Sequence, residues 1–260
     1  MSNSWTFGII TDGKNRQGVT DLVESIYSQV PRDICEIILV GDNGSDPSNR
    51  HKCLFGSNWL HVNFDENERP GWITKKKNII AAKATYSNVC ILHDYYLLEP
   101  DWLEGFQEFG YHWDVCCNPL VNKEGQRHSD WLVNPDYMHR FWRTNPHMFG
   151  HLGHINGDPK YICGLPYNVR GMEQTQYVSG GYIVAKREVL LDCPFDETLT
   201  WGLDEDVQWS TTFKMRHGLY FNPYSIAKAN RPNKWALEEI PQSVLTEVAK
   251  FYGRTIRYVS

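Results

Sequence analysis

The sequence predicts an α/β fold in which a mostly parallel central sheet is flanked by helices. Three short apolar runs, 7–10, 36–40 and 89–92, each stop at polar residues, and an amphipathic stretch at 19–30 separates the first two. Continuous apolar runs of this length are typical of strands that are covered on both faces. Two such strands with a helix between them form a β-α-β unit with parallel pairing and a right-handed crossover.

The other elements are predicted in order along the chain. The first helix has Thr20 or Asp21 as its cap and ends at Pro31. A third strand at 59–64 precedes a helix at 78–86. Lys75, Lys76 and Lys77 stand at the start of this helix, which leads into the 89–92 strand. Later patterns predict strands at 177–185, 219–221 and 225–229, and we expect the last two to return to the central sheet. They also predict helices at 187–191 and from 204 to about 217, and one or two amphipathic helices within 234–252 that are interrupted near Pro241.

Composition argues against several classes of protein. The 260 residues, 41% of them hydrophobic, are enough for one large α/β domain. The formal net charge of −5 leaves no basic face for nucleic acid. A membrane-spanning helix needs about 18 or more consecutive apolar residues, and no apolar run in this sequence approaches that length. The first residues lack the cationic and apolar segments of a secretory signal, so we expect a cytoplasmic protein with no membrane span.

The cysteines predict buried thiols. Their number is odd, none stands in a CxxC pair, and most lie inside apolar runs, at positions 35, 53, 90, 116, 117, 163 and 193. This pattern indicates a reducing compartment and argues against a disulfide framework or a structural zinc site.

Acidic residues follow three of the predicted parallel strands. Asp12, Asp42 and Asp94 stand at carboxyl ends, which meet at the sheet edge where open α/β sheets bind their ligands. We therefore expect the three to line one crevice, although His93 and Asp94 alone would also fit a loop start in which the aspartate caps the next element. The chain has neither GxGxxG after its first strand nor GxxxxGK[ST], which argues against dinucleotide oxidoreductases and P-loop enzymes.

Residues 110–176 show little periodicity. The stretch is rich in aromatic residues, Asn and Pro and holds six of the ten histidines, so we predict a loop-rich insertion with a binding role. His147, His151 and His154 have a spacing that would suit a metal on one helical face, but the nearby Gly and Pro residues argue against a helix there.

Two further groups lie beyond residue 176. Gly180 and Gly181 precede an apolar strand and indicate either close approach of a ligand to the backbone or a bulge. Asp204, Glu205 and Asp206 precede a helix, where the helix dipole favours carboxylates, so they indicate either a capping cluster or a functional group.

Taken together, five segments resemble motifs of the GT-A glycosyltransferases, in particular the inverting enzymes of glycosyltransferase family 2. The segments are EIILVGDNGSD, KKNIIAAKA, ILHDYYLLEPDWL, YVSGGYIVAKREV and FDETLTWGLDEDVQWS, and the resemblance covers roughly residues 5–230. It implies a single GT-A domain over 1–260. Its nucleotide-sugar-binding half would be 5–109, its acceptor-binding and catalytic half 110–230, and its C-terminal helical tail 231–260.

The resemblance also implies a reaction and roles for single residues. The chain would move a sugar from a UDP- or GDP-type donor to a hydroxyl of a glycan or other acceptor, with Asp206 as general base and Glu205 beside it. Trp201 and Asp204 would contact the acceptor. Donor contacts would come from Thr11, Asp12, Asp42, Lys77, Asn78, His93, Asp94, Gly180 and Gly181.

One motif departs from the family pattern. The usual Asp-x-Asp reads His93-Asp94-Tyr95, and the stretch 227–230 lacks the late histidine that often completes the metal site. Mg²⁺ and Mn²⁺ prefer several oxygen ligands. Three possibilities therefore stay open: a metal held by Asp94 and the donor diphosphate, a Mn²⁺ site assisted by His93, or a metal-free enzyme in which Lys228 partly neutralises the phosphates.

Two other functions fit the same predicted fold. A sugar nucleotidyltransferase would carry a glycine-rich basic loop after the first strand, and TDGKNRQG is a poor version of it. A non-catalytic module that binds a nucleotide sugar or a glycan would explain the altered Asp-x-Asp. The identity of the base, the sugar and the acceptor cannot be read from the sequence.

Overall fold

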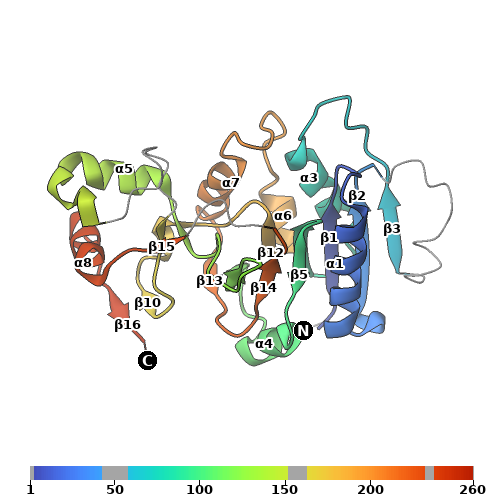
Figure 1. Cartoon of the computed structure of the whole chain (residues 1–260), viewed down its shortest axis with the longest axis horizontal. Helices are drawn as coiled ribbons and strands as arrows, with labels where there is room; N and C mark the ends of the chain where they lie inside the picture. Colours follow the sequence, from blue (N-terminus) through green and yellow to red (C-terminus); the bar gives the residue numbers. More distant parts are fainter. Residues whose placement is uncertain (1–2, 43–57, 152–162, 232–236, 260) are drawn as a thin grey trace.

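The computed structural model describes residues 3–42, 58–151, 163–231 and 237–259. At its centre is a seven-stranded sheet with the strand order β13-β6-β12-β4-β1-β2-β3 (Figure 1). Neighbouring strands are parallel except at β12, which is antiparallel to both β4 and β6. The bounds are β1 Trp5–Ile10, β2 Cys35–Val40, β3 Trp59–Val62, β4 Asn88–His93, β6 Val115–Cys117, β12 Tyr182–Lys186 and β13 Leu219–Phe221. The predicted α/β fold with a mostly parallel central sheet is confirmed.

Alternation along β1 explains why both faces of the sheet are covered. Trp5, Phe7 and Ile9 belong to one buried cluster, which also contains residues of α1 (Arg16–Gln29) and α4 (Trp102–Phe109). Gly8 lies on the other face, where a Cβ would be 2.3 Å from Ile80 Cγ2 of α3 (Ile73–Lys83). Because side chains alternate between the two faces of a strand, one six-residue segment supports a helix layer on each side.

The second face carries three helices from distant parts of the sequence. Buried residues of α3, α6 (Arg187–Asp192) and α7 (Glu205–Phe213) share one cluster with β12 and β13. Trp209 of α7 stacks on Phe195 with ring centroids 4.5 Å apart, and its Nε1 donates to the carbonyl of Cys193 at 2.7 Å. Burial of aromatic side chains of this size, with the indole N–H satisfied, fixes α7 against the chain that follows α6.

The prediction of a loop-rich stretch over 110–176 is only partly correct. It contains β6 of the central sheet and α5, Pro135–Thr144, which begins after an Asn134 side chain that accepts from Asp136 N. Strands of two or three residues carry no periodicity, so the pattern could not reveal them. His147 and His151 lie on a 3₁₀ helix, Pro146–His151, whereas His154 is outside the described residues, so the three-histidine hypothesis falls partly outside them.

Short strands form three small sheets beside the central one. They are β5-β14-β7 (Tyr96–Leu98, Ala227–Ala229, Leu120–Val121), β11-β8-β9-β15 (Gln176–Tyr177, Leu132–Val133, Cys163–Gly164, Glu238–Glu239) and β10-β16 (Val169–Arg170, Arg257–Tyr258). The prediction that 225–229 returns to the central sheet is therefore wrong, because β14 pairs with β5 and β7. The predicted 177–185 strand is split into β11 and β12 by the Gly180–Gly181 turn.

The end of the chain packs far from β1. The helix α8 (Gln242–Phe251) begins after Pro241, as its ring predicts, and lies near α5 at the end of the molecule opposite β3 (Figure 1). The remaining 3₁₀ helices are Arg32–Ile34 and Glu173–Thr175. In the described part of the chain, no helix combines the length and apolarity that a membrane crossing requires.

The cysteines of the described segments agree with the prediction. Six of them are buried, at positions 35, 90, 116, 117, 163 and 193. Cys53 lies outside the described residues.

Candidate active site

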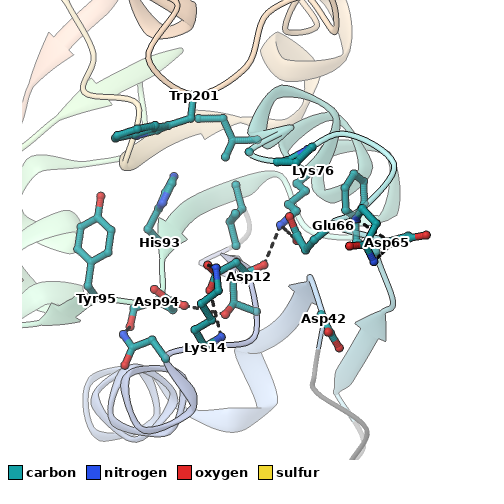
Figure 2. Close-up of a pocket in the computed structure, with 18 of the residues that line it drawn as sticks. Asp12, Lys14, Asp42, Asp65, Glu66, Lys76, His93, Asp94, Tyr95 and Trp201 are labelled. Atoms are coloured by element: carbon teal, nitrogen blue, oxygen red, sulfur yellow. Dashed lines mark hydrogen bonds and ion pairs between the residues drawn. The ribbon is translucent and has the colours of Figure 1, made fainter.

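A cavity of about 870 Å³ lies at the carboxyl ends of β1, β2 and β4 (Figure 2). It is lined by six of the residues that the sequence pointed to, Thr11, Asp12, Asp42, His93, Asp94 and Trp201. Pockets for small molecules and cofactors usually have volumes of about 300–1,000 Å³. This cavity is therefore large enough for a nucleotide-sized ligand, and it lies where parallel sheets bind one.

Two glycines bring the ends of β1 and β2 together. A Cβ on Gly41 would lie 2.1 Å from the Thr11 carbonyl oxygen, and one on Gly13 would lie 2.4 Å from that of Asp42. Gly13 has a φ of +82°, which residues with side chains rarely adopt. The two loops therefore need glycine to approach each other, and Asp12 and Asp42, which stand next to these glycines in the sequence, both lie at the floor of the cavity, across from Trp201.

Asp94 is held against the end of β1. Its Oδ2 accepts from Thr11 Oγ1 at 2.6 Å, its backbone N–H donates to Ile10 O at 3.2 Å, and its carbonyl accepts from Asn15 Nδ2 at 2.9 Å. Burial raises the pKa of the Asp94 carboxyl, and the hydrogen bond from Thr11 opposes this shift only in part. The result is a fixed carboxyl with one oxygen already engaged.

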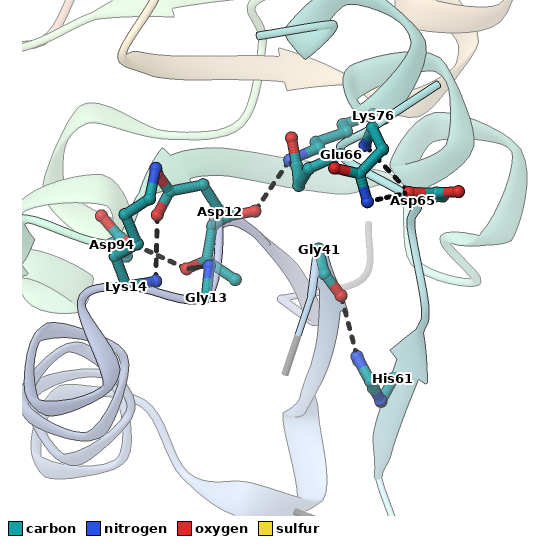
Figure 3. Close-up of polar contacts among 11 residues, drawn as sticks. Asp12, Gly13, Lys14, Gly41, His61, Asp65, Glu66, Lys76 and Asp94 are labelled. Carbon is teal, nitrogen blue, oxygen red and sulfur yellow. Dashed lines mark hydrogen bonds and ion pairs between the residues drawn. The ribbon is translucent and has the colours of Figure 1, made fainter. Parts of the chain in front are cut away.

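Asp12 is bound to a cation of its own loop. Lys14 donates to it twice, from its backbone N–H at 3.0 Å and from Nζ at 2.8 Å (Figure 3). Burial alone would raise the pKa of Asp12, but the bonds and the charge of Lys14 outweigh burial and lower it. Asp12 is therefore an ionised acceptor at neutral pH.

The lysines of α3 separate into two roles. Lys76 lines the cavity, where its Nζ donates to Thr11 O at 2.7 Å and pairs with Glu66 (Figure 3). Lys77 instead is fully buried, and its Nζ lies 3.5 Å from Glu205 Oε1. The sequence indicated Lys77 for the donor, yet the structure places Lys76 in the cavity, because successive residues of a helix point about 100° apart.

Asn78 also lies away from the cavity. Its Nδ2 donates to Phe195 O and its Oδ1 accepts from Phe195 N, both at 2.9 Å. This bidentate contact ties α3 to the chain after α6, so the side chain is occupied by a structural contact.

Three neighbouring side chains form one wall of the cavity. The Nε2 of His93 is buried and has no hydrogen-bond partner within the described residues. Burial, followed by the charge of Lys77, lowers the pKa of His93 to about 3, so the imidazole is neutral near pH 7. The Arg231 guanidinium lies 4.0 Å from the centroid of the Tyr95 ring, and both residues line the cavity. The sequence contained no motif that singled out Arg231.

The Gly180–Gly181 turn links this wall to the acidic pair of α7. Gly180 N donates to Asp206 Oδ2 at 2.9 Å, and His93 N donates to Gly181 O at 3.0 Å. A Cβ on Gly180 would lie 2.7 Å from Glu205 Oε1. Glu205 and Asp206 therefore lie directly behind the wall, although neither is among the residues that line the cavity.

The loop before α7 reaches the cavity mouth. The backbone N–H of Trp201 donates to Gly71 O at 3.0 Å, and its indole, 72% exposed, lies across the cavity from Asp12 and Asp94 (Figure 2). Asp204 occupies the N-cap position of α7 with a φ of +54° but makes no side-chain capping bond. The capping interpretation therefore fails for Asp204, and its exposed carboxylate is available for other contacts.

The residues around Asp94 fit a protein-held divalent cation poorly. Within the described segments, only Asp192, Cys193 and His217 bring three ligand atoms of His, Cys or acidic side chains within 4.8 Å of one another, and this group is elsewhere. Asp12 is paired with Lys14, and one oxygen of Asp94 with Thr11. Mg²⁺ and Mn²⁺ need several convergent oxygen ligands, which this part of the cavity does not supply.

Comparison with known proteins identifies the fold. No family model and no curated protein sequence matches the chain. Among solved structures, GalNAc-T7 with UDP, GalNAc and Mn²⁺ matches 95% of this chain and 47% of its own, with a TM-score of 0.59 and 14% identity. The mannosyltransferase PcManGT from Pyrobaculum calidifontis with GDP-Man and Mn²⁺ matches 89% of this chain and 58% of its own, with a TM-score of 0.54 and 16% identity. TarS 1–349 of S. aureus matches 95% of this chain and 64% of its own, with a TM-score of 0.51 and 16% identity.

The chain has a GT-A fold. This confirms the fold that the ordered sequence motifs predicted. This chain covers between 47% and 64% of the length of the three solved chains. At identities of 14–16% the likeness establishes the GT-A fold, and the chemistry has to be argued from this chain's own cavity.

Proposed function

We propose that this chain is an inverting glycosyltransferase that transfers a sugar from a UDP- or GDP-type donor to a hydroxyl of a glycan or other acceptor. The observation that carries the proposal is the cavity of about 870 Å³ at the strand ends of a GT-A fold, whose lining includes the strand-end aspartates Asp12, Asp42 and Asp94 and the cations Lys76 and Arg231. The solved structures named with UDP, UDP plus GalNAc, or GDP-Man support the same class of donor.

In the proposal, the floor of the cavity binds the nucleoside. Asp12 and Asp42 offer carboxylate oxygens at adjacent strand ends, which suit the hydroxyls of a ribose and the N–H groups of a base. The hydrogen bond from Thr11 holds Asp94 in place beside them in the cavity lining. Donor preference between UDP and GDP then depends on the shape of the cavity beyond Asp42.

Protein cations stabilise the leaving diphosphate. Arg231 and Lys76 both line the cavity, and charge-assisted hydrogen bonds to phosphate oxygens are stronger than neutral ones. Negative charge builds up on the diphosphate as the glycosidic bond breaks, so fixed cations lower the barrier. We assign this role to Arg231 in place of Lys228, which is absent from the cavity lining. Because the donor set around Asp94 fits a divalent cation poorly, we expect transfer to continue in the presence of EDTA.

The acidic pair of α7 supplies the base. The acceptor hydroxyl gives its proton to Asp206, its oxygen bonds to the anomeric carbon, and the bond from that carbon to the diphosphate oxygen breaks on the opposite face. The Gly180 N–H fixes Asp206 Oδ2 at 2.9 Å, and Glu205 lies beside it, with its pKa raised by burial. A single displacement of this kind inverts the configuration of the anomeric carbon.

The exposed Trp201 indole provides an apolar platform for an acceptor ring at the mouth of the cavity, and the carboxylate of Asp204 lies nearby in the sequence. Gly180 and Gly181 keep the backbone close to the reacting sugar. The burial of the cysteines supports a cytoplasmic, reducing location.

The test is an Asp206→Asn variant assayed with UDP- and GDP-sugars. We expect transfer to be lost while calorimetry shows donor binding close to that of the unchanged protein. Asp136→Asn, an exposed position on α5, is the matched control and should keep full activity. Full transfer by Asp206→Asn would overturn the assignment of the base. Binding without transfer in the unchanged protein would favour a non-catalytic binding module, and pyrophosphate release from a nucleoside triphosphate plus a sugar phosphate would favour a nucleotidyltransferase.

A further inference from the structure

A second group of metal-ligating side chains lies outside the cavity. Asp192 and Cys193 stand at the end of α6, and His217 precedes β13, yet one ligand atom of each lies within 4.8 Å of the others. His217 Nε2 is 2.8 Å from Asp192 Oδ2, and Cys193 Sγ is 3.6 Å from the same oxygen. We propose that this Asp192–Cys193–His217 cluster, which uses one cysteine and no CxxC pair, is a site for Zn²⁺.

The spacing of the three atoms suits a tetrahedral ion. Zinc binds thiolate sulfur at about 2.3 Å and imidazole nitrogen or carboxylate oxygen at about 2.0–2.2 Å, which places neighbouring ligand atoms about 3.3–3.7 Å apart. The observed 3.6 Å between sulfur and oxygen meets this value, and the 2.8 Å between nitrogen and oxygen has to open by about half an ångström. Asp192 and His217 are partly exposed, with 42% and 20% of their side chains accessible, so an ion can enter from solvent and keep water as its fourth ligand.

The residues around the cluster would orient its ligands. Asp114 Oδ2 accepts from Gly218 N at 2.7 Å and lies 4.0 Å from His217 Nδ1, the nitrogen that would face away from the metal. A carboxylate behind a metal-bound histidine fixes the ring and its tautomer. Arg216 donates to Asp192 Oδ1 at 3.0 Å, leaving Oδ2 for the ion, and its other nitrogen is 3.5 Å from Cys193 Sγ.

The sulfur ligand favours zinc over the harder cations. On binding, Zn²⁺ takes the thiolate, and the thiol proton is released to solvent. A sulfur ligand selects zinc over Mg²⁺ and Mn²⁺, which prefer oxygen ligands.

The position of the cluster points to a role in holding the fold together. Residues 114 and 217 precede β6 and β13, and these strands run in the same direction as β4 because β12 is antiparallel to both β4 and β6. The cluster therefore lies near the amino ends of β6 and β13, whereas the cavity lies at the carboxyl ends of β1, β2 and β4. An ion there would join the end of α6 to the start of β13, and Trp209 of α7 already donates to Cys193 O at 2.7 Å.

The test uses the full chain after treatment with a chelator, and Co²⁺ as a visible substitute for Zn²⁺. We expect one equivalent of Co²⁺ to give a thiolate-to-cobalt charge-transfer band, Zn²⁺ to displace it, and Zn²⁺ to raise the melting temperature. His217→Gln should weaken Zn²⁺ binding by more than about 100-fold, and Asp114→Asn by about 10–100-fold, as for other groups that orient a ligand.

Matched variants separate this site from the cavity. His139→Gln, an exposed histidine of α5, and Asp94→Asn, in the cavity, should both bind Zn²⁺ like the unchanged protein. Circular dichroism shows whether each variant is folded. Absence of the charge-transfer band, unaltered Zn²⁺ affinity in folded His217→Gln, or loss of the band in Asp94→Asn would each overturn the zinc site. None of these outcomes bears on the proposed sugar transfer, which is assayed separately.

Discussion

Two lysines of α3 form ion pairs with residues outside that helix. The two pairs should differ in their contribution to stability because only one of them is buried. Lys77 Nζ lies 3.5 Å from Glu205 Oε1, and Lys75 Nζ lies 3.5 Å from Glu68 Oε1. The side chains of the first pair are 0% and 7% exposed, and those of the second are 31% and 57% exposed. Replacing each lysine with methionine therefore tests the effect of burial at constant distance.

The expected sizes depend on the surroundings of each pair. Two unit charges 3.5 Å apart attract by about 5 kcal/mol at an effective dielectric constant of about 20, and by about 1 kcal/mol in bulk water. Burial lowers the pKa of Lys77 and raises that of Glu205, so each group needs its partner to remain charged. Lys77→Met should cost about 3–5 kcal/mol because it leaves a buried carboxylate unpaired. Lys75→Met should cost about 1 kcal/mol or less.

The assay is urea denaturation, with the free energy of unfolding obtained from the midpoint and the slope. A Glu205→Gln variant and the double variant with Lys77→Met complete a cycle, and the double variant should be more stable than the sum of the two single losses implies. If Lys77→Met and Lys75→Met reduce the free energy of unfolding by equal amounts, or if the cycle shows no coupling, the reasoning from burial is refuted.

Three further changes test the cavity. Gly181→Ala should lower kcat because a Cβ there would lie 2.8 Å from Tyr95 Oη; unchanged kcat in the steady-state assay would show that the wall can adjust. Arg231→Gln should weaken binding of UDP or GDP in calorimetry by about 10–100-fold, the usual loss for a hydrogen bond to a charged group, whereas exposed Arg143→Gln should not. Burial holds the pKa of His93 at about 3, below the about 6.5 of an unfolded chain, so the unfolded chain binds more protons between these values. Stability should therefore fall as pH falls through this window, and His93→Gln should have a flatter curve; parallel curves would contradict the burial of the imidazole.

The strands that the sequence predicted best are those of the first half. The apolar runs at 36–40 and 89–92 match β2 (Cys35–Val40) and β4 (Asn88–His93) to within one residue at each end. A strand buried on both faces has to be apolar along its whole length, so its composition alone identifies it. Because such strands pair in parallel, the positions of Asp12, Asp42 and Asp94 around one cavity could also be predicted.

The second half was harder to predict for a physical reason. β6 has three residues, and β11 has two, which is too short for a period of two to be visible. These strands form because partners distant in sequence pair with them: β6 lies between β12 and β13. Their positions are decided by tertiary contacts that leave no local pattern.

The sequence by itself determined the α/β class, the parallel order of the first strands and the acidic residues at their ends, since these depend on local hydrophobic pattern and on the geometry of parallel pairing. Only the tertiary structure decided that Lys76 faces the cavity while Lys77 meets Glu205, that Arg231 joins the same wall, and that Cys193 and His217 approach each other. A change of one position on a helix rotates a side chain by about 100°, and contacts between distant segments depend on how whole elements pack.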